Sequence, residues 1–382
     1  MRYRNPMDHH HPDPGEGPDP ARTRLAELRA QIDDTDRKLL RLLDQRLECA
    51  LQTARLKTVI TDGGREDQVI SQVRAAAYGL LSEDFVSDLY RSIIDESKRL
   101  QARRPRFGGF QGEHGAWSEM ALERWDGNLV PIPCRTFADV FEGVTSAAFD
   151  RGIVPVENSL GGSVVEVSDL LIETTLSMVG EVRVPVRQCL LALPGTTLGE
   201  IRSVRSHPQA LAQCRGYLAR HGFAVEPFYD TAGAARWLMF EGVRGVGVIA
   251  SPLAASLYGL EIVAEDVADH EGNETRFVVL ARQLHTGPAD KGSLVLKTED
   301  RSGALVQALG AFAGHNVNLS RIESRPNRGK HGQYTFMLDF EGDPANDDVA
   351  RALSALSSQG VSYKVLGFYR ADSGAATTGE GA

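Results

Sequence analysis

Two cationic side chains interrupt an apolar helical seam near the N-terminus. Apolar residues recur there at heptad a and d positions: Leu25, Leu28, Ile32, Leu39 and Leu42. The next a position is Arg46, and a guanidinium on an apolar seam is costly unless it binds an anion. Lys57 follows at about 20° around the helix axis and roughly 16 Å along it. Two such cations can converge on a small dianion, although the heptad pattern alone favours a coiled-coil dimerisation arm.

A later helical stretch carries a similar anomaly. Val86, Tyr90 and Ile93 mark one face, and the polar residues Ser97 and Gln101 continue it. Polar groups on a buried stripe need partners, so this face predicts a polar pocket within a helical bundle. Three further charged residues lie between the two stretches: Asp62, Arg65 and Glu66. The first of them is also a credible helix N-cap.

The order LR-x2-ID-x2-D-x2-LL-x-LL-x2-R, then K, D-x2-RE and S-x3-Q, resembles the all-helical class of chorismate mutase. The resemblance implies a substrate-binding set: Arg29, Arg46, Lys57, Asp62, Arg65, Glu66, Ser97 and Gln101. Chorismate carries two carboxylates and rearranges without a covalent catalyst, so the protein need only hold a compact conformer and stabilise charge on the ether oxygen. In the family, cations bind the carboxylates while a Lys and a Gln approach the ether oxygen. The resemblance therefore implies Lys57 and Gln101 at that oxygen and Glu66 at the substrate hydroxyl.

Arg29 lies about 100° around the helix from the Arg46 face, so one helix can hardly present both to one pocket. The resemblance implies an intertwined dimer in which Arg29 crosses to the neighbour's site. We therefore predict a homodimer, or a higher homo-oligomer, through this segment. The alternative is a degenerate helical arm that dimerises without catalysing.

Polar loops recur between short apolar runs in the middle of the chain. The stretch FQGEHGAWSEMA has a Gly-rich turn and then Ser118, which we expect to cap a helix. Such a turn suits an anion, although no GK[ST] follows to make it a phosphate loop. In VPVENSLGGS a strand leads into Glu157 and Asn158, a pair that a simple turn does not explain.

Two more polar stretches follow. In SHPQALAQC, Ser206 and His207 are adjacent, which excludes a nucleophile–base pair in regular backbone, and Ser206 is a good N-cap for the helix that carries Gln213. In GNETRF, Thr275 and Arg276 enter a strand, where the arginine could bind a carboxylate through two parallel hydrogen bonds.

These loops, with DTAGAA, resemble prephenate dehydratase in type and order, and their wording is closest to the branch shared with plant arogenate dehydratases. The resemblance implies two α/β subdomains like those of periplasmic binding proteins, with the substrate in the cleft. It implies Thr275 as hydrogen-bond donor to the departing hydroxyl, since a threonine is a poor acid. Asn158, Ser206 and Gln213 are its supporting residues, and Arg276, Glu157 and Ser118 bind substrate. No cofactor or metal is implied.

The C-terminal region orders its elements as strand, helix, strand, strand, helix, strand, which predicts an α+β ferredoxin-like module. Its GAL and ESRP elements resemble the ACT domain of the same enzymes. The resemblance implies a phenylalanine site made from two short runs: Gly303, Ala304, Leu305, and Glu323, Ser324, Arg325, Pro326. The alternative is a dimerisation sheet that has lost its ligand.

These patterns divide the chain into successive parts. We predict a disordered leader (1–20), an all-α domain (21–103), an α/β domain (106–283), a regulatory module (291–371) and a flexible tail (372–382). The leader lacks the apolar core of a secretory signal, and its HHH run holds a metal only if further ligands join it.

Composition limits the function classes. Hydrophobic residues make up 42% and charged residues 24% of 382 residues, which is ordinary for a globular protein. The net charge of −9 disfavours nucleic acid as a partner, and no apolar run approaches a membrane span. Four cysteines lie far apart without a CxxC pattern, which predicts reduced thiols in a cytoplasmic protein.

The sequence therefore predicts a bifunctional enzyme that rearranges chorismate, dehydrates prephenate to phenylpyruvate and responds to phenylalanine. A solute-binding or sensory protein is the alternative from another class, but it gives no reason for Arg46 and Lys57 on a bundle seam. Among enzymes, the runner-up is an arogenate dehydratase.

Overall fold

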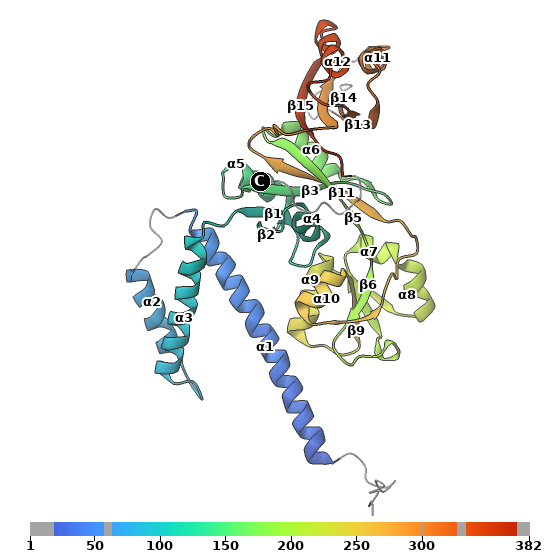
Figure 1. Ribbon diagram of the computed structural model, residues 1–382. Coiled ribbons are helices and arrows are strands. Elements are labelled where there is room, and N and C mark those ends of the chain that lie inside the picture. The colour runs from blue at the N-terminus through green and yellow to red at the C-terminus, as the bar shows by residue number, and fades with distance from the viewer. Residues whose placement is uncertain (1–18, 57–62, 300, 327–333, 373–382) are drawn as a thin grey trace, which may run out of the picture. The chain divides into compact units, whose positions relative to one another are not determined.

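The computed structural model describes residues 19–56, 63–299, 301–326 and 334–372 (Figure 1). The chain divides into two compact units, residues 1–47 and 48–382. The long helix α1 (Pro20–Thr53) begins in the first unit and ends in the second. Along α1 the predicted apolar seam is exposed in this single chain, with Ile32 at 59% and Leu39 at 52% of their accessible surface.

Two further helices complete the helical segment, α2 (Gly63–Ala76) and α3 (Glu83–Ala102), and they pack against each other. Ser82 caps α3 by accepting the Phe85 amide at 3.2 Å, and two acidic residues in the first turn suit the helix dipole. The predicted polar stripe lies on the buried face of α3, where Ser97 and Gln101 are both buried.

The middle region has two lobes, and each is built on one sheet. The first sheet has the order β2-β1-β3-β11-β5, with the short β4 paired to β3. Its strands are β1 (Phe107–Gln111), β2 (Val130–Cys134), β3 (Arg151–Asn158), β4 (Gly162–Ser163), β5 (Ser177–Pro185) and β11 (Glu274–Ala281). Its helices are α4 (Trp117–Trp125), α5 (Phe137–Thr145) and α6 (Val165–Glu173).

The second sheet has the order β10-β6-β9-β7-β8. Its strands are β6 (Cys189–Ala192), β7 (Ser203–Ser206), β8 (Ala224–Pro227), β9 (Val246–Ala250) and β10 (Glu261–Ala264). The helical elements of this lobe are the 3-10 turn Leu198–Glu200, α7 (Pro208–Gln213), α8 (Arg215–His221), α9 (Thr231–Glu241) and α10 (Pro252–Tyr258). The chain crosses from lobe to lobe after β5 and returns in β11, which pairs antiparallel with both β3 and β5. This double crossing confirms the predicted two-subdomain α/β fold.

The C-terminal module, residues 291–372, is a four-stranded antiparallel sheet of order β13-β14-β12-β15 with two helices. Its elements are β12 (Lys291–Lys297), α11 (Ala304–Ala313), β13 (Leu319–Pro326), β14 (Tyr334–Glu341), α12 (Asp347–Ser358) and β15 (Ser362–Tyr369). The predicted ferredoxin-like order is confirmed.

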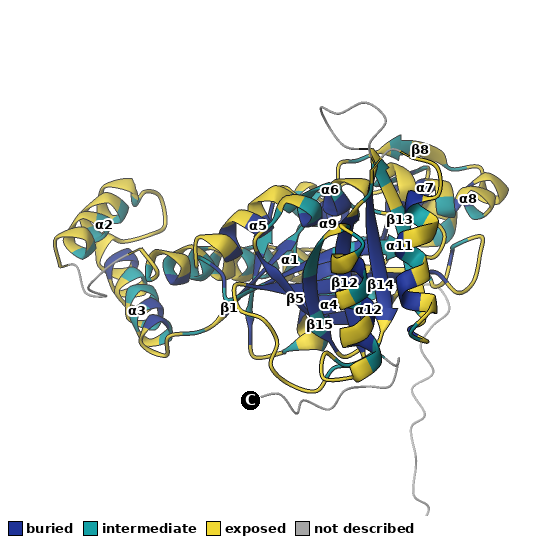
Figure 2. Cartoon of the chain, turned by 90° about the horizontal axis from the view of Figure 1, so that it is seen from above, coloured by how far each residue is buried: buried dark blue, intermediate teal, exposed yellow. Residues whose placement is uncertain are grey.

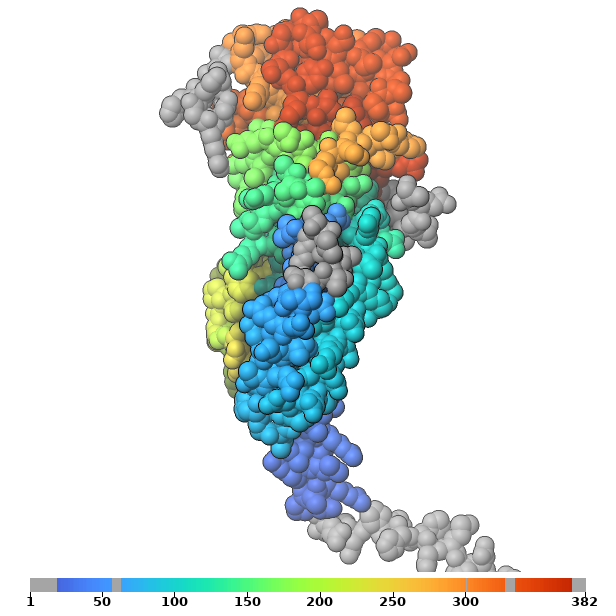
Figure 3. All heavy atoms as spheres, turned by 90° about the vertical axis from the view of Figure 1, so that its left-hand side faces the viewer, coloured from blue at the N-terminus to red at the C-terminus, as the bar shows by residue number. Residues whose placement is uncertain are grey.

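The core shows how these parts are joined within the second unit. Figure 2 shows the strands largely buried and the outer faces of the helices exposed. One apolar cluster combines residues of the first sheet with the module's Val295, Met337, Leu366 and Tyr369. The orange and red atoms of the module accordingly lie directly against the green atoms of the first lobe (Figure 3). In the described part of the chain, no helix is long and apolar enough to cross a membrane.

Candidate active site

A pocket of about 460 Å³ is lined by residues from both lobes. The first sheet and its helices contribute Gln111, Ser118, Asn158, Thr275 and Phe277, among others. The second lobe contributes Gln188, His207, Gln209, Gln213 and Asp230. The pocket therefore brings together four of the residues that the sequence predicted for dehydratase chemistry: Asn158, Thr275, Gln213 and Ser118.

Asn158 organises the first-lobe side of this pocket. Its Nδ2 donates to Thr275 Oγ1 at 2.9 Å and to Asn273 Oδ1 at 2.7 Å. Its Oδ1 accepts the backbone amides of Leu160 (3.1 Å) and Gly161 (2.7 Å), which fixes the side chain at the end of β3. Because the Thr275 oxygen accepts from Asn158, its own hydroxyl proton is left for another acceptor.

A chain of amides continues into the second lobe. Gln213 Oε1 accepts from Gln188 Nε2 at 3.0 Å and from Asn273 Nδ2 at 3.2 Å. Gln188 and Asn273 are 3% and 6% exposed, so their hydrogen bonds to Gln213 are shielded from solvent. Neither residue was predicted from the sequence. Asn273 could have been noticed two residues before Thr275, but nothing in the sequence around Gln188 marks it.

Three titratable side chains, His207, Tyr229 and Asp230, line the second-lobe side. Asp230 caps α9 by accepting the Gly233 amide at 2.7 Å. Burial, together with the nearby charge of Glu113, raises the pKa of Asp230, although the hydrogen bond from Gly233 opposes the shift. Among the pocket-lining residues that the structure describes, none is Lys or Arg, and His207 is the only side chain there that can become positive.

Strand alternation separates neighbouring predicted residues. Thr275 and Phe277 line the pocket, so Arg276 between them faces the opposite side of the sheet, where it is 3% exposed. Its guanidinium binds Glu181 and Asp339 at 2.6 Å each and the Tyr369 hydroxyl at 3.0 Å. This geometry does not support the prediction that Arg276 binds a substrate carboxylate.

Three further site expectations need correction or qualification. Glu157 precedes Asn158 on β3 and is outside the pocket lining; its carboxylate lies 3.9 Å from the Arg321 guanidinium. Ser206 ends β7 and is fully buried, donating to the Ile249 carbonyl at 2.6 Å, so His207 instead caps α7. Ser118 is the second residue of α4, whose N-cap is Ala116. Its position nevertheless puts it in the pocket lining.

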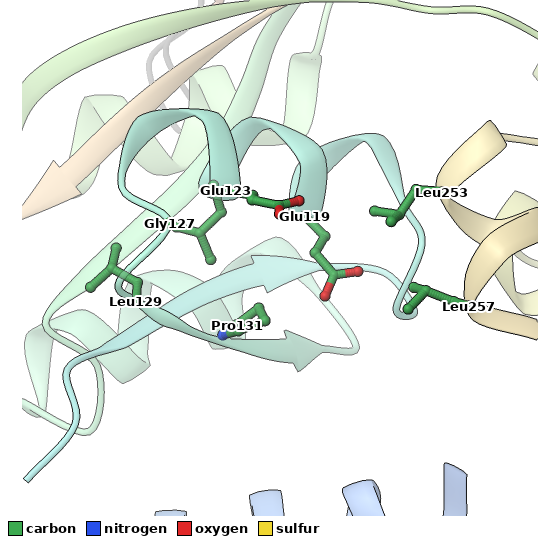
Figure 4. Close-up of a pocket in the computed structure, with 8 residues that line it drawn as sticks. Glu119, Glu123, Gly127, Leu129, Pro131, Leu253 and Leu257 are labelled. Carbon is green, nitrogen blue, oxygen red and sulfur yellow. The ribbon is translucent and has the colours of Figure 1, made fainter. Parts of the chain in front are cut away.

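A second cavity, of about 230 Å³, lies beside α4 and α10 (Figure 4). Figure 4 shows the carboxylates of Glu119 and Glu123 among leucine side chains. Two carboxylates in an apolar hollow repel a dianion, so this cavity does not suit the predicted substrates. In the described part of the chain, no group of His, Cys, Asp and Glu is arranged to hold a metal ion.

In the helical segment, several predicted mutase residues have protein partners. Glu66 accepts from Lys98 at 2.6 Å, and Arg65 donates to Gln68 at 2.7 Å. Ser97 donates to the Ile93 carbonyl at 2.8 Å, and Gln101 donates to the Ala50 carbonyl. Lys98 is a charged neighbour that the sequence analysis did not select.

The other four residues predicted for the mutase site lie in the first unit or outside the described residues. Arg29 and Arg46 belong to the first unit, in which Arg29 is exposed. Lys57 and Asp62 lie outside the described residues. The roles assigned to all of these residues remain predictions.

The expected effector residues occupy two positions in the C-terminal module. Gly303, at φ +79°, is the N-cap of α11, and Ala304 and Leu305 follow in its first turn. On β13, Glu323 accepts from Ser168 of α6 at 3.1 Å. Arg325 binds Asp169 of the same helix at 3.0 Å. Ser324 and Pro326 alternate with them and are exposed.

Comparison with known protein families gives three matches in chain order. They are chorismate mutase type II over residues 28–102, prephenate dehydratase over 109–284, and ACT domain over 292–358. These matches confirm the predicted domain types and their order.

Named relatives agree with the middle and C-terminal matches. Arogenate dehydratase 2 of Petunia hybrida is 40% identical over 284 residues, covering 70% of this chain and 72% of the relative. The chloroplastic arogenate dehydratase/prephenate dehydratase 2 of Arabidopsis thaliana is 42% identical over 275 residues, covering 69% and 72%.

Two solved structures share the fold. The prephenate dehydratase of Arthrobacter aurescens in complex with L-Phe has a TM-score of 0.64 and 34% identity, covering 69% of this chain and 89% of that one. A protein described as GqqA, a novel type of quorum quenching acylase, has a TM-score of 0.66 and 37% identity, covering 70% and 99%. Given the two-lobed pocket, the three family matches and these relatives, the chain belongs to the prephenate dehydratase family, in an arrangement that joins the dehydratase to a chorismate mutase and an ACT domain.

Proposed function

We propose that the chain rearranges chorismate to prephenate in its helical segment and converts prephenate to phenylpyruvate in the two-lobed pocket. The observation that carries the second step is the Asn158–Thr275 hydrogen bond, in which Asn158 donates at 2.9 Å. Because the Thr275 oxygen accepts this bond, its hydroxyl can donate its proton to a substrate atom in the pocket. Thr275 then hydrogen-bonds the departing ring hydroxide while carbon dioxide leaves and the ring becomes aromatic.

The pocket suggests how the two substrate carboxylates are bound without arginine. Trp117 and Ser118 line it from the first turn of α4, where backbone N–H groups have no intrahelical acceptor. The glycine turn at Gly161 and Gly162 lines it as well, and His207 adds a side-chain hydrogen-bonding group. Helix and turn amides with one histidine replace the role expected of Arg276.

Replacement of Thr275 tests this assignment. Thr275→Val removes the hydroxyl with little change of shape, and we expect phenylpyruvate formation to fall by about 10² to 10⁴. Thr275→Ser keeps the hydroxyl and should retain much of the rate. Prephenate formation from chorismate in the same preparations reports on the helical segment and should not change. Wild-type dehydratase rates in Thr275→Val would contradict the role of Thr275.

Arogenate is the second candidate substrate, and one observation favours it. The carboxyl of Asp230 lines a pocket without Lys or Arg, and arogenate carries an ammonium group where prephenate carries a keto group. An ionised Asp230 would pair with that ammonium, whereas a keto oxygen has no charge with which the carboxylate could pair. Comparing kcat/KM for the two substrates, in wild type and in Asp230→Asn, distinguishes them. Loss confined to arogenate would assign Asp230 to the ammonium.

Phenylalanine is the proposed effector, bound at the α11 N-terminus and at β13. The first run offers backbone amides at Gly303–Leu305. The second carries two charged side chains, Glu323 and Arg325. A solved relative is described as a complex with L-Phe, which supports this ligand. Calorimetric titration with phenylalanine, paired with dehydratase assays, tests binding and inhibition separately. A homodimer and a cytoplasmic location complete the proposal.

A further inference from the structure

A buried cluster of charges joins the catalytic strand β11 to the C-terminal module. Arg276 Nε lies 2.6 Å from Glu181 Oε2, and its Nη1 lies 2.6 Å from Asp339 Oδ2 of the module. Its Nη2 donates to the Tyr369 hydroxyl at 3.0 Å, while Lys291 binds Glu181 at 2.8 Å. All five residues are at most 7% exposed. Three of them, Lys291, Asp339 and Tyr369, belong to the module.

The cluster is electrically balanced, with two cations and two carboxylates. Burial alone would raise the pKa of Asp339, but the charge of Arg276, with Arg321, Lys291 and the Ser293 hydroxyl, holds that pKa below its usual range. Asp339 therefore stays ionised, and the guanidinium has a fixed carboxylate in the module. Replacing a buried ion pair by apolar groups often costs little stability, so stability alone is a weak reason for this arrangement.

The strand geometry connects this cluster to the pocket. Arg276 directly follows Thr275, and alternation places the two side chains on opposite faces of one strand. Thr275 is opposite Asn158 in the register of β11 with β3. On its other side, Glu274 binds Arg183 at 2.8 Å, so both neighbours of Thr275 are held through their side chains. Because Arg276 and Thr275 are joined by a peptide bond, a displacement of the Arg276 backbone would act directly on Thr275.

Strand pairing also connects the cluster to the proposed effector residues. In the module, Glu323 of β13 is opposite Met337 of β14, and Arg321 is opposite Asp339. The carboxylate that binds Arg276 is thus on the strand next to the one carrying Glu323 and Arg325. An effector that shifts β13 acts on Asp339 through one pair of hydrogen-bonded strands.

We propose that Arg276 is a positioning residue whose ion pair with Asp339 sets the catalytic position of Thr275 and transmits effector binding to it. This inference rests on the proposed regulation by phenylalanine. In this proposal Arg276 couples the module to the pocket through its neighbour Thr275. Substrate contact is no part of that role.

The test removes both charges of the pair together. A single replacement leaves one buried charge without its partner and can unfold the protein, whereas Arg276→Met with Asp339→Leu leaves Lys291 balanced by Glu181. Glu341→Gln is the matched control, because Glu341 is exposed on the same strand and accepts from Asn318 of the module at 2.9 Å. If the double variant does not fold, Arg276→Lys, which keeps the positive charge but not the forked contact with two carboxylates, is measured with the same readouts.

Two readouts separate coupling from a merely structural role. We expect the folded double variant to bind phenylalanine like wild type in calorimetry, while the half-inhibitory concentration rises by about fivefold or more. Its dehydratase kcat should fall with KM unchanged, and the control should match wild type in every measurement. Unchanged kcat together with unchanged inhibition in the double variant would overturn the inference and leave the proposed function intact. A wild-type enzyme that does not respond to phenylalanine would overturn the proposed regulation and this coupling together.

Discussion

In the proposed reaction the Thr275 hydroxyl acts through the direction of its proton, and the hydrogen bond from Asn158 sets that direction. Asn158→Asp keeps the shape of the side chain but replaces the donating amide by a carboxylate. Thr275 would then donate to the aspartate instead of the substrate. We expect a loss of about 2–3 kcal/mol of transition-state stabilisation, which lowers the dehydratase kcat by the corresponding factor and changes KM little. Steady-state kinetics with prephenate measure both constants.

The control for this exchange is Asn346→Asp. Asn346 caps α12 through its side-chain oxygen, and aspartate is an equally good N-cap, so activity and stability should stay near wild type. A wild-type kcat in Asn158→Asp would show that the hydroxyl proton is not directed by Asn158.

At the residue scale, the residue types at strand ends and in polar loops indicated which side chains would line the pocket. Asn158, Thr275 and Gln213 line one pocket, as the resemblance implied. The prediction for Arg276 followed from its place beside Thr275 in the motif, although alternation along a strand puts the two side chains on opposite faces. Gln188 was not predictable, since its contact with Gln213 depends on how two distant segments meet.

At the scale of elements, one glycine permits the module to approach the first lobe. A Cβ at Gly367 of β15 would lie 2.0 Å from the Met178 carbonyl oxygen of β5, a backbone atom that cannot rotate away. Gly367→Ala should therefore separate β15 from β5 and lower the free energy of unfolding by roughly 1–3 kcal/mol. Thermal unfolding measures the loss.

Gly310→Ala is the matched control. A Cβ at Gly310 meets nothing within 4 Å, and the residue is inside helix α11. Alanine favours a helix over glycine by about 0.5–1 kcal/mol, so this variant should be equal to or more stable than wild type. If Gly367→Ala unfolds at the wild-type temperature, the close approach of β15 to β5 is not required.

Element order was largely predictable, whereas sheet order was not. The alternation of strands and helices indicated the ferredoxin-like module because its connections are local. The position of β11 between β3 and β5 could not be predicted from the sequence, because this pairing joins segments separated by the whole second lobe. That return puts Thr275 beside Asn158.

At the scale of the whole molecule, the buried Arg276–Asp339 ion pair makes the free energy of unfolding depend on pH. The lowered pKa of Asp339 means that its ion pair stabilises the fold fully above the ordinary aspartate pKa of about 3.9 and is lost as the pH falls below it. Asp339→Asn should be less stable than wild type near neutral pH by about 3 kcal/mol. The difference in the free energy of unfolding between wild type and Asp339→Asn should become smaller below about pH 4. Denaturant unfolding at several pH values checks this, and a difference that does not vary with pH would contradict it.

The exposed seam of α1 bears on the assembly, since Leu25, Ile32 and Leu39 are all about half exposed or more in one chain. An intertwined dimer would cover them and deliver Arg29 to the neighbour's mutase site. Arg29→Ala and Gln101→Ala should each abolish mutase activity alone. After mixing and exchange of subunits, half of the dimers are mixed, and one of their two sites is intact, so about a quarter of the activity should return.

This recovery depends on which subunit supplies Arg29. If Arg29 served its own subunit's pocket, every site in a mixed dimer would carry one replacement, and mixing would restore nothing. Dehydratase activity in the same samples provides the control, because neither replacement lies near Asn158 or Thr275 in sequence and that rate should stay constant. Recovery close to a quarter would support a mutase site shared between two chains.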